Sequence, residues 1–179
     1  MNYIRFNAEN EFTYHWCGKF VAPDENWIHM TRNQGDYELF VMVEGILHIA
    51  DETSEHTVSP GEYLLMPPNN CQHGTRPSLC SFYWMHFGYH QEQNDHELLS
   101  DIPVSSQTDV LIYTPGQLLL PKQGRLPSPE RLIILMKQLQ DSDRRYREAT
   151  LNRYLCSAIL AEVALQSQAY PSYGNKFLK

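Results

Sequence analysis

The chain lacks the sequence features of several protein classes. Its four cysteines are scattered, and no two of them have the CxxC spacing of a zinc knuckle or a dithiol redox centre. No stretch approaches the length of apolar sequence that spans a membrane, and the N-terminus has no apolar signal-peptide core. These absences predict a cytoplasmic protein without membrane contact and with free thiols at Cys17, Cys71, Cys80 and Cys156.

Positive charge is also scarce. Lys and Arg number 14 against 21 Asp and Glu, which gives a formal net charge of -7. An acidic surface repels a phosphate backbone, so these residues are not expected to bind nucleic acid themselves. The sequence has no nucleophile elbow, glycine-rich phosphate loop or His-Glu-x-x-His motif. It therefore predicts no catalytic residue and no cofactor, and we expect a protein that is not an enzyme.

The first part of the chain is rich in strand-forming residues. Between residues 12 and 121, Gly, Pro, Asn and Asp separate short runs of β-branched and aromatic residues. These runs predict strands at residues 37–43, 46–51, 56–58, 63–66 and 80–87. Many short strands at this spacing favour a sandwich or a barrel over alternating strands and helices.

The sequence changes to a helical period after about residue 127. Ser128 is a candidate N-cap and Pro129 suits the first helical position. The apolar residues that follow recur on one helical face, at Leu132, Leu135, Met136 and Leu139. A second helix is predicted from about residues 143–145 to 168. The tail at 171–179 has no period and is interpreted as a linker.

The second helix is apolar over more than one stripe, so it is expected to bury two sides. One side would pack on its own domain. The other would form a homodimer, for which the candidate residues are Leu151, Tyr154, Leu155, Ala158, Ile159 and Glu162. The alternative is a helix that simply lies in a groove of the barrel.

One stretch, GEYLLMPPNNCQHG, carries a more specific signal. Gly61 is followed by five residues, Pro67, a tight turn and His73, and Glu38 precedes Gly45 by seven residues. This order resembles the two motifs of the cupin superfamily. The resemblance implies a double-sheet jelly-roll barrel, and the turn before His73 is one residue longer than the usual pattern.

Cupin enzymes hold a metal with two His, a Glu and a further His. The positions of the paired His are occupied here by Arg32 and Gln34, and neither side chain is a good transition-metal ligand. Only Glu38 and His73 of the set remain, and two ligands do not make a catalytic metal site. We therefore expect no metal, although a metal-dependent cupin enzyme acting on a sugar-like substrate remains the alternative.

Three stretches resemble more narrowly the N-terminal effector-binding and dimerisation domain of AraC-type bacterial transcription regulators. They are YELFVMVEGILHI, PGEYLLMPPN and HGTRPSLCSFYWMHF. The resemblance implies a mainly β cupin barrel with an N-terminal arm at residues 1–122, then two C-terminal helices at 123–170. It also implies a homodimer, and DNA contact only through a C-terminal helix-turn-helix module that these residues do not include. A free-standing sugar-binding cupin is a further alternative.

Strand alternation and this resemblance together select the ligand-binding candidates. Alternate residues share one face of a strand, and the motif Glu of cupins points into the barrel. The candidates are Glu38, Phe40, Met42, Glu44, His73, Phe82, Trp84 and His86. The resemblance places a stacking aromatic at Trp84, and Trp with polar groups favours a carbohydrate effector. Open alternatives are that Phe40, Met42 and Phe82 are core residues and that Glu44 is solvated. Glu38 needs a partner, either a ligand or His73.

Two further predictions concern the edges of this pocket. Trp27 and His29 are candidates for its mouth. The N-terminal stretch up to about Ala22 carries aromatic residues that could close over it as a lid.

Overall fold

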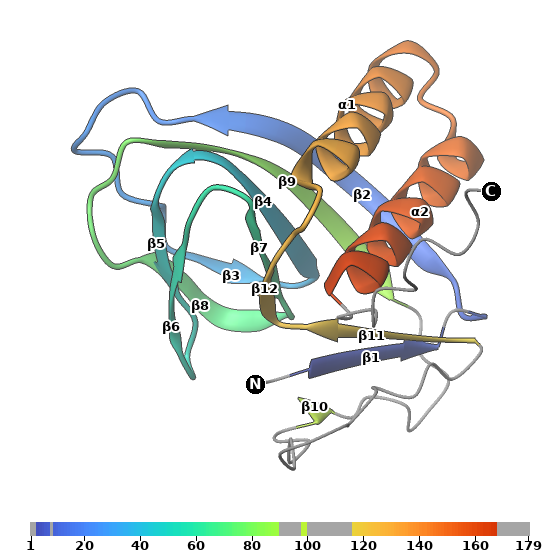
Figure 1. The fold of residues 1–179 in the computed structure, drawn as a ribbon, viewed down its shortest axis with the longest axis horizontal. Coiled ribbons are helices and arrows are strands. Elements are labelled where there is room, and N and C mark those ends of the chain that lie inside the picture. The colour runs from blue at the N-terminus through green and yellow to red at the C-terminus, as the bar shows by residue number, and fades with distance from the viewer. Residues whose placement is uncertain (1–2, 8, 90–97, 100–115, 168–179) are drawn as a thin grey trace, which may run out of the picture.

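A computed structural model describes residues 3–7, 9–89, 98–99 and 116–167. Its described part is mainly β, with two helices near the C-terminal end, as predicted (Figure 1). The strands are β1 (Tyr3–Asn7), β2 (Phe12–Val21), β3 (Arg32–Gln34), β4 (Tyr37–Gly45), β5 (Leu47–Ala50), β6 (Glu55–Val58), β7 (Glu62–Met66), β8 (Asn69–Gly74), β9 (Cys80–Tyr89), β10 (Leu98–Leu99), β11 (Gln117–Pro121) and β12 (Gln123–Arg125). The helices are α1 (Pro129–Arg145) and α2 (Ala149–Ser167).

The described strands form three antiparallel sheets. The largest has the order β12-β7-β4-β9-β2, a second has the order β3-β8-β5-β6, and a third has the order β10-β1-β11. The helix pair lies beside strands β2 and β9, whereas β5, β6 and β8 lie at the far side of the barrel (Figure 1). This is the cupin-like barrel followed by two helices that the sequence predicts.

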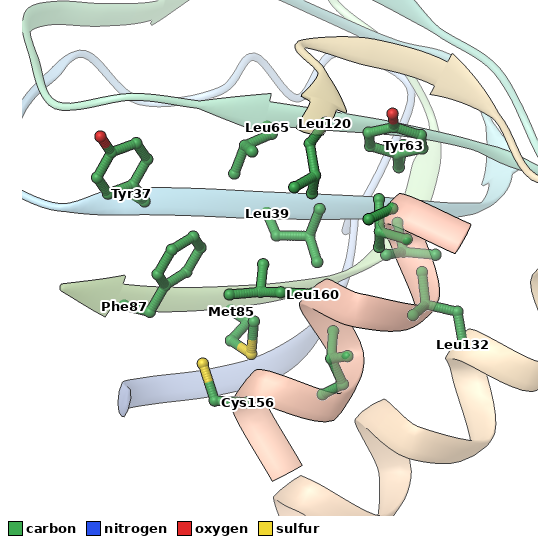
Figure 2. Packing of buried hydrophobic residues seen from close by; sticks show 14 of the residues in the cluster. Tyr37, Leu39, Tyr63, Leu65, Met85, Phe87, Leu120, Leu132, Cys156 and Leu160 are labelled. Atoms are coloured by element: carbon green, nitrogen blue, oxygen red, sulfur yellow. The ribbon is translucent and has the colours of Figure 1, made fainter. Parts of the chain in front are cut away.

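The five-stranded sheet buries both of its faces, because successive side chains of a strand point in opposite directions. One face packs on the helices through residues such as Leu39 and Met85, which contact Cys156 and Leu160 of α2 in one cluster (Figure 2). The other face points into the barrel and meets the four-stranded sheet. Its buried cluster includes Phe40, Met42, Leu47, Ile49, Val58, Leu64, Met66 and Phe82. The interior of the barrel is therefore a core separate from the one between the sheet and the helices.

The two helices differ slightly from their predicted bounds. Helix α1 continues through Arg145, so α2 begins at Ala149 and not at 143–145. The chain reverses between them, where Arg147 has a φ of 50°. Ser128 is the N-cap residue of α1 but makes no side-chain cap hydrogen bond. Its backbone N–H and C=O instead bond the side-chain amide of Gln166, which joins the start of α1 to the end of α2.

The segments around the barrel are tied to it as strands. The predicted N-terminal arm contains β1, which pairs with β10 and β11, and β2, which pairs with β9 along its length. Strand β12 pairs with β7 before the helices begin. The predicted linker at 171–179 lies outside the described residues. No helix in the described part of the chain is both long enough and apolar enough to cross a membrane.

Candidate effector cavity

A cavity of about 200 Å³ opens into the barrel interior. All three tryptophans of the chain line it. The full lining is Trp16, Phe20, Trp27, His29, Met30, Arg32, Glu38, Phe82, Trp84 and His86. Five aromatic side chains and four titratable ones thus surround one small space.

Three neighbouring strands build the wall of this cavity in register. Strand β9 lies between β4 and β2, so each of its inward residues has a partner on both sides. The first row is Glu38, His86 and Trp16, the second is Phe40, Trp84 and Gly18, and the third is Met42, Phe82 and Phe20. The wall therefore changes along the strands from a charged end to an apolar end.

The aromatic rings of the wall contact one another. Trp16 stacks on His86 with ring centroids 4.8 Å apart and meets Trp84 edge-on at the same distance. Phe20 stacks on Phe82 at 5.1 Å. Trp16 is 51% exposed although it lies over the charged end, so it forms an outer border of the site.

The segment between β2 and β3 supplies the remaining lining residues. The carbonyl of Trp27 accepts a hydrogen bond from the N–H of Ser78, and that of His29 accepts one from the N–H of Gly74. These two bonds fix the segment against β8 and the residues that follow it. His29 Nδ1 lies 2.9 Å from the carbonyl oxygen of Met30. Because a carbonyl only accepts, Nδ1 must carry the proton, and Nε2 is left as an acceptor.

Glu38 is the centre of the charged end and is only 2% exposed. Arg32 Nη2 lies 2.6 Å from its Oε2, and Gln72 Nε2 donates to the same oxygen at 2.8 Å. His86 Nε2 lies 3.2 Å from Oε1, within ion-pair distance. A buried carboxylate is tolerated only with such compensation.

The charges continue from His86 towards the surface. His86 Nδ1 lies 3.0 Å from Asp36 Oδ1, and His15 Nδ1 lies 2.6 Å from Asp36 Oδ2. Burial lowers the pKa of His86, but the charges of Glu38 and Asp36 outweigh it and raise that pKa above its ordinary value. Burial likewise raises the pKa of Glu38, yet His86, Arg32 and Gln72 hold it below the usual range. The arrangement thus favours an imidazolium between two carboxylates, with Arg32 as the second cation.

Some buried polar atoms at this site have no hydrogen-bond partner among the described residues. Arg32 Nε is buried and has no hydrogen-bond partner among the described residues, and the same holds for Gln72 Oε1. The pKa of His29 is lowered by burial, which keeps its ring neutral and its Nε2 available as an acceptor. The cavity can therefore offer a ligand aromatic faces together with the guanidinium of Arg32 and the imidazole of His29, since both side chains line it.

Four of the eight predicted ligand residues line the cavity, namely Glu38, Phe82, Trp84 and His86. Phe40 and Met42 share their face but are fully buried in the barrel core, outside the described lining. Glu44 is exposed, because the pairing of β4 with β9 shifts register between Met42 and Glu44. An extra residue of this kind turns the next side chain to the other face.

His73 is not placed as its motif position implies. Gln72 is fully buried and bonds Glu38, whereas His73 is half-buried beside Cys71. Neighbouring residues of a strand point to opposite faces. The additional residue in the turn after Pro67 therefore brings Gln72, not His73, into the barrel, and the expected Glu38–His73 pair does not form.

The two positions of the paired cupin His take part in the charged network instead. Arg32 bonds Glu38, and the Gln34 side chain contacts both Asp36 and His86 Nδ1. No group of three or more His, Cys, Asp or Glu that could hold a metal occurs in the part of the chain that the structure describes. The cupin motif implies a metal ion beside Glu38, and in this chain the Arg32 guanidinium contacts Glu38 instead.

The sequence did not predict Met30 in the lining, and it placed the aromatic residues before Ala22 in a lid, whereas Trp16 and Phe20 line the cavity from strand β2, which is paired with β9. Trp27 and His29 were predicted at its mouth and do line it. The signal for strand β2 was the alternation of Trp16, Gly18 and Phe20, which share one face. Arg32 was considered only as a poor metal ligand, although a cation six residues before a buried Glu could have been read as its partner.

The predicted dimer residues of α2 divide between two environments. Leu151 and Tyr154 are exposed, and so is Ala158 one turn further on. Leu155 and Glu162 are half-buried, and Ile159 is fully buried in the core of this chain. Only the first three offer an apolar surface to a second molecule, and Leu165 extends that surface.

Comparison with known proteins adds a transcriptional context. No protein-family model matches the chain. It is 25% identical over 151 residues to an uncharacterized HTH-type transcriptional regulator, YisR of Bacillus subtilis (strain 168). The match covers 79% of this chain and 50% of YisR, so the chain spans about half the length of this curated relative.

Among solved structures, two cupin-like ones illustrate the similarity. A cupin-2 domain containing protein from Shewanella frigidimarina NCIMB 400 has a TM-score of 0.32 and 19% identity, over 42% of this chain and 70% of that chain. KdgF from Halomonas sp. has a TM-score of 0.34 and 15% identity, over 50% and 82%. Neither similarity carries an argument about ligand or activity.

Proposed function

We propose that this chain is the effector-sensing and dimerisation part of an AraC-type transcription regulator. The observation that carries the proposal is the aromatic cavity, with three tryptophans around a small space and polar atoms at one end. The similarity to an HTH-type regulator supports it. In this proposal the chain acts in the cytoplasm, and DNA is bound by a helix-turn-helix module outside these residues.

The effector is a small neutral ring, and a carbohydrate fits best. Tryptophan faces pack on the C–H faces of a sugar ring, while hydroxyls bond polar groups at its edge. The side chains of Arg32 and His29, which line the cavity, would supply a donor and an acceptor for such hydroxyls. The cations Arg32 and His86 balance the anions Glu38 and Asp36, so the charged end has no excess charge to neutralise. A neutral effector is favoured for that reason.

Sensing, and not catalysis, is favoured by the state of Glu38. Arg32 and Gln72 bond its Oε2, and His86 Nε2 lies 3.2 Å from its Oε1, so both oxygens face protein groups and neither is directed at a substrate or a metal. Metal analysis of protein purified without chelator tests this view. Near-stoichiometric iron, manganese, nickel or zinc would instead support a cupin enzyme.

The effector proposal predicts a selective effect of Trp84→Ala. A thermal-shift screen of neutral sugars and other small metabolites should first identify a compound that stabilises the wild-type chain. Loss of the indole should then weaken that compound about tenfold or more, through lost stacking of about 1.4 kcal/mol. Isothermal titration measures the affinity. If the variant loses thermal stability in proportion to affinity, Trp84 is a core residue and not a contact.

The dimer proposal predicts that acidic substitutions on the exposed face of α2 release monomers. Leu151→Glu combined with Tyr154→Glu places two charges on the apolar surface, where a dimer would bury them without partners. Both side chains are exposed in this chain, so the barrel should remain folded. Sedimentation at several concentrations measures the fraction of dimer. Gln138→Glu, at an exposed position of α1, is the matched control. A dimer that survives the double change would place the interface elsewhere.

A further inference from the structure

The middle row of the cavity wall combines the largest side chain with the smallest. Trp84 of β9 is paired in register with Gly18 of β2. Trp16 and Phe20 on either side of Gly18 line the cavity, so the missing side chain of Gly18 would point to the same face. A glycine within a strand often marks a close approach of another group.

The approach at Gly18 is so close that a side chain at this position would require Trp84 to move. A Cβ atom added there would lie 2.7 Å from Cε2 and 3.0 Å from Nε1 of Trp84. The backbone of Gly18 is not in the left-handed region that favours glycine, unlike that of Gly45. The requirement is therefore for space and not for backbone conformation, and the atoms that need the space belong to a cavity-lining indole.

We propose that Gly18 sets the size of the effector cavity, by letting the Trp84 indole lie back against β2, and thereby limits the effector to a single ring. The proposal rests on the proposed function. A methyl group at Gly18 pushes the indole away from β2. Because Trp16 meets Trp84 edge-on at 4.8 Å and Phe40 flanks it on β4, the free direction is into the cavity. The space for a ligand then shrinks.

The volume of the cavity indicates the size of the ligand that it can hold. The cavity volume of about 200 Å³ lies below the range of about 300–1,000 Å³ that is usual for the sites of drug-sized ligands. That space suits one sugar-sized ring, whereas two linked rings would need a larger enclosed volume. Small changes in such a space have large effects, since one methylene in a fitted pocket alters binding by about tenfold or more.

A purely structural role for this pair makes different predictions. An aromatic side chain that covers a glycine on an edge strand can stabilise the sheet without any ligand. In that case Gly18→Ala would lower the melting temperature but leave the ligand space unchanged. The proposal instead requires that the shape of the cavity change, which a crystal structure reveals without a ligand.

The test compares Gly18→Ala with Gly35→Ala in the same chain. A Cβ at Gly35 meets no atom within 4 Å, so this control adds the same methyl group in open space. The crystal structure of Gly18→Ala should show Trp84 displaced and the cavity reduced, whereas Gly35→Ala should preserve both. Unchanged Trp84 and cavity volume in Gly18→Ala would overturn the proposal.

Binding is measured against a panel of neutral pentoses, hexoses and their disaccharides. Gly18→Ala should weaken the best monosaccharide about tenfold or more, and Gly18→Ala with Trp84→Phe should regain part of the loss. Trp84→Phe alone should admit a disaccharide that the wild type rejects. A wild type that binds disaccharides as well as single rings overturns the size limit. If no sugar binds any form, the carbohydrate assignment fails, while the crystal structures still decide the role of Gly18.

Discussion

Replacing Arg32 by leucine should destabilise the fold by about 3 kcal/mol, because it leaves the buried Glu38 carboxylate without its nearest cation. Glu38 is 2% exposed and cannot recover its hydration. Gln72 and His86 remain, but an amide carries no charge and His86 also serves Asp36. The expected loss corresponds to roughly 6–12 °C in melting temperature for a chain of this size. Urea unfolding at neutral pH measures it.

Two controls separate this effect from a general loss of an arginine. Arg76→Leu removes an exposed arginine that lies 4.0 Å from the exposed Glu55, and should change stability by less than about 0.5 kcal/mol. Arg32→Leu with Glu38→Leu removes both members of the buried pair and should recover most of the stability. If the single and double variants are equally unstable, Arg32 contributes by packing and not by its charge.

The residues of the cavity show what strand alternation predicts and what it cannot predict. Glu38, Phe82, Trp84 and His86 were predicted on the inward face from strand parity together with the cupin resemblance, and all four line the cavity. Parity fails wherever the register shifts. Glu44 leaves the face through the shift between Met42 and Glu44, which depends on how β4 pairs with β9. Local sequence does not record that pairing.

The other unpredicted contacts come from segments distant in the sequence. Trp16 reaches the cavity because β2 pairs with β9, some seventy residues later, with a register shift at His15. Gln72 takes the place expected for His73 because one added residue in the preceding turn reverses the parity of β8. The motif positions identified the region of the site, while the turn length decided which side chain enters it.

We expect the buried carboxylates to make the fold less stable as the pH falls, and His86 to make it less stable as the pH rises. The pKa values of Asp36, Glu38 and Asp51 are all lowered in the fold in spite of burial. His86 lowers those of Asp36 and Glu38, with a further contribution from Arg32 at Glu38, and Lys122 lowers that of Asp51. A carboxyl group whose pKa is lowered by folding stabilises the fold above its unfolded pKa of about 4. This stabilisation is lost as the pH falls below that value and through the folded pKa. We therefore expect cooperative unfolding in acid, followed by circular dichroism from pH 6 to pH 2.

His86 should act in the opposite direction. Its pKa is raised in the fold, so its contribution is complete below the unfolded value of about 6.5 and is lost as the pH rises through the higher folded value. The variant His86→Gln removes this contribution. The free energy of unfolding of the wild type minus that of the variant should therefore be largest near pH 5–6 and decline above about pH 6.5.

This difference isolates His86 from the other buried histidines. Burial lowers the pKa values of His29 and His56, so their contribution falls as the pH drops below about 6.5. Both groups are present in the wild type and in the variant, and they cancel on subtraction. His48→Gln, on β5 outside the charged network, is the matched control for the loss of an imidazole. A difference that is flat from pH 5 to pH 9 would mean that folding leaves the pKa of His86 unchanged, and a difference that falls below about pH 6.5 would mean that His86 is neutral in the fold. Asp36 and Glu38 would then be held by Arg32 and the neutral donors around them, and the balance of charge that favours an uncharged effector would be lost.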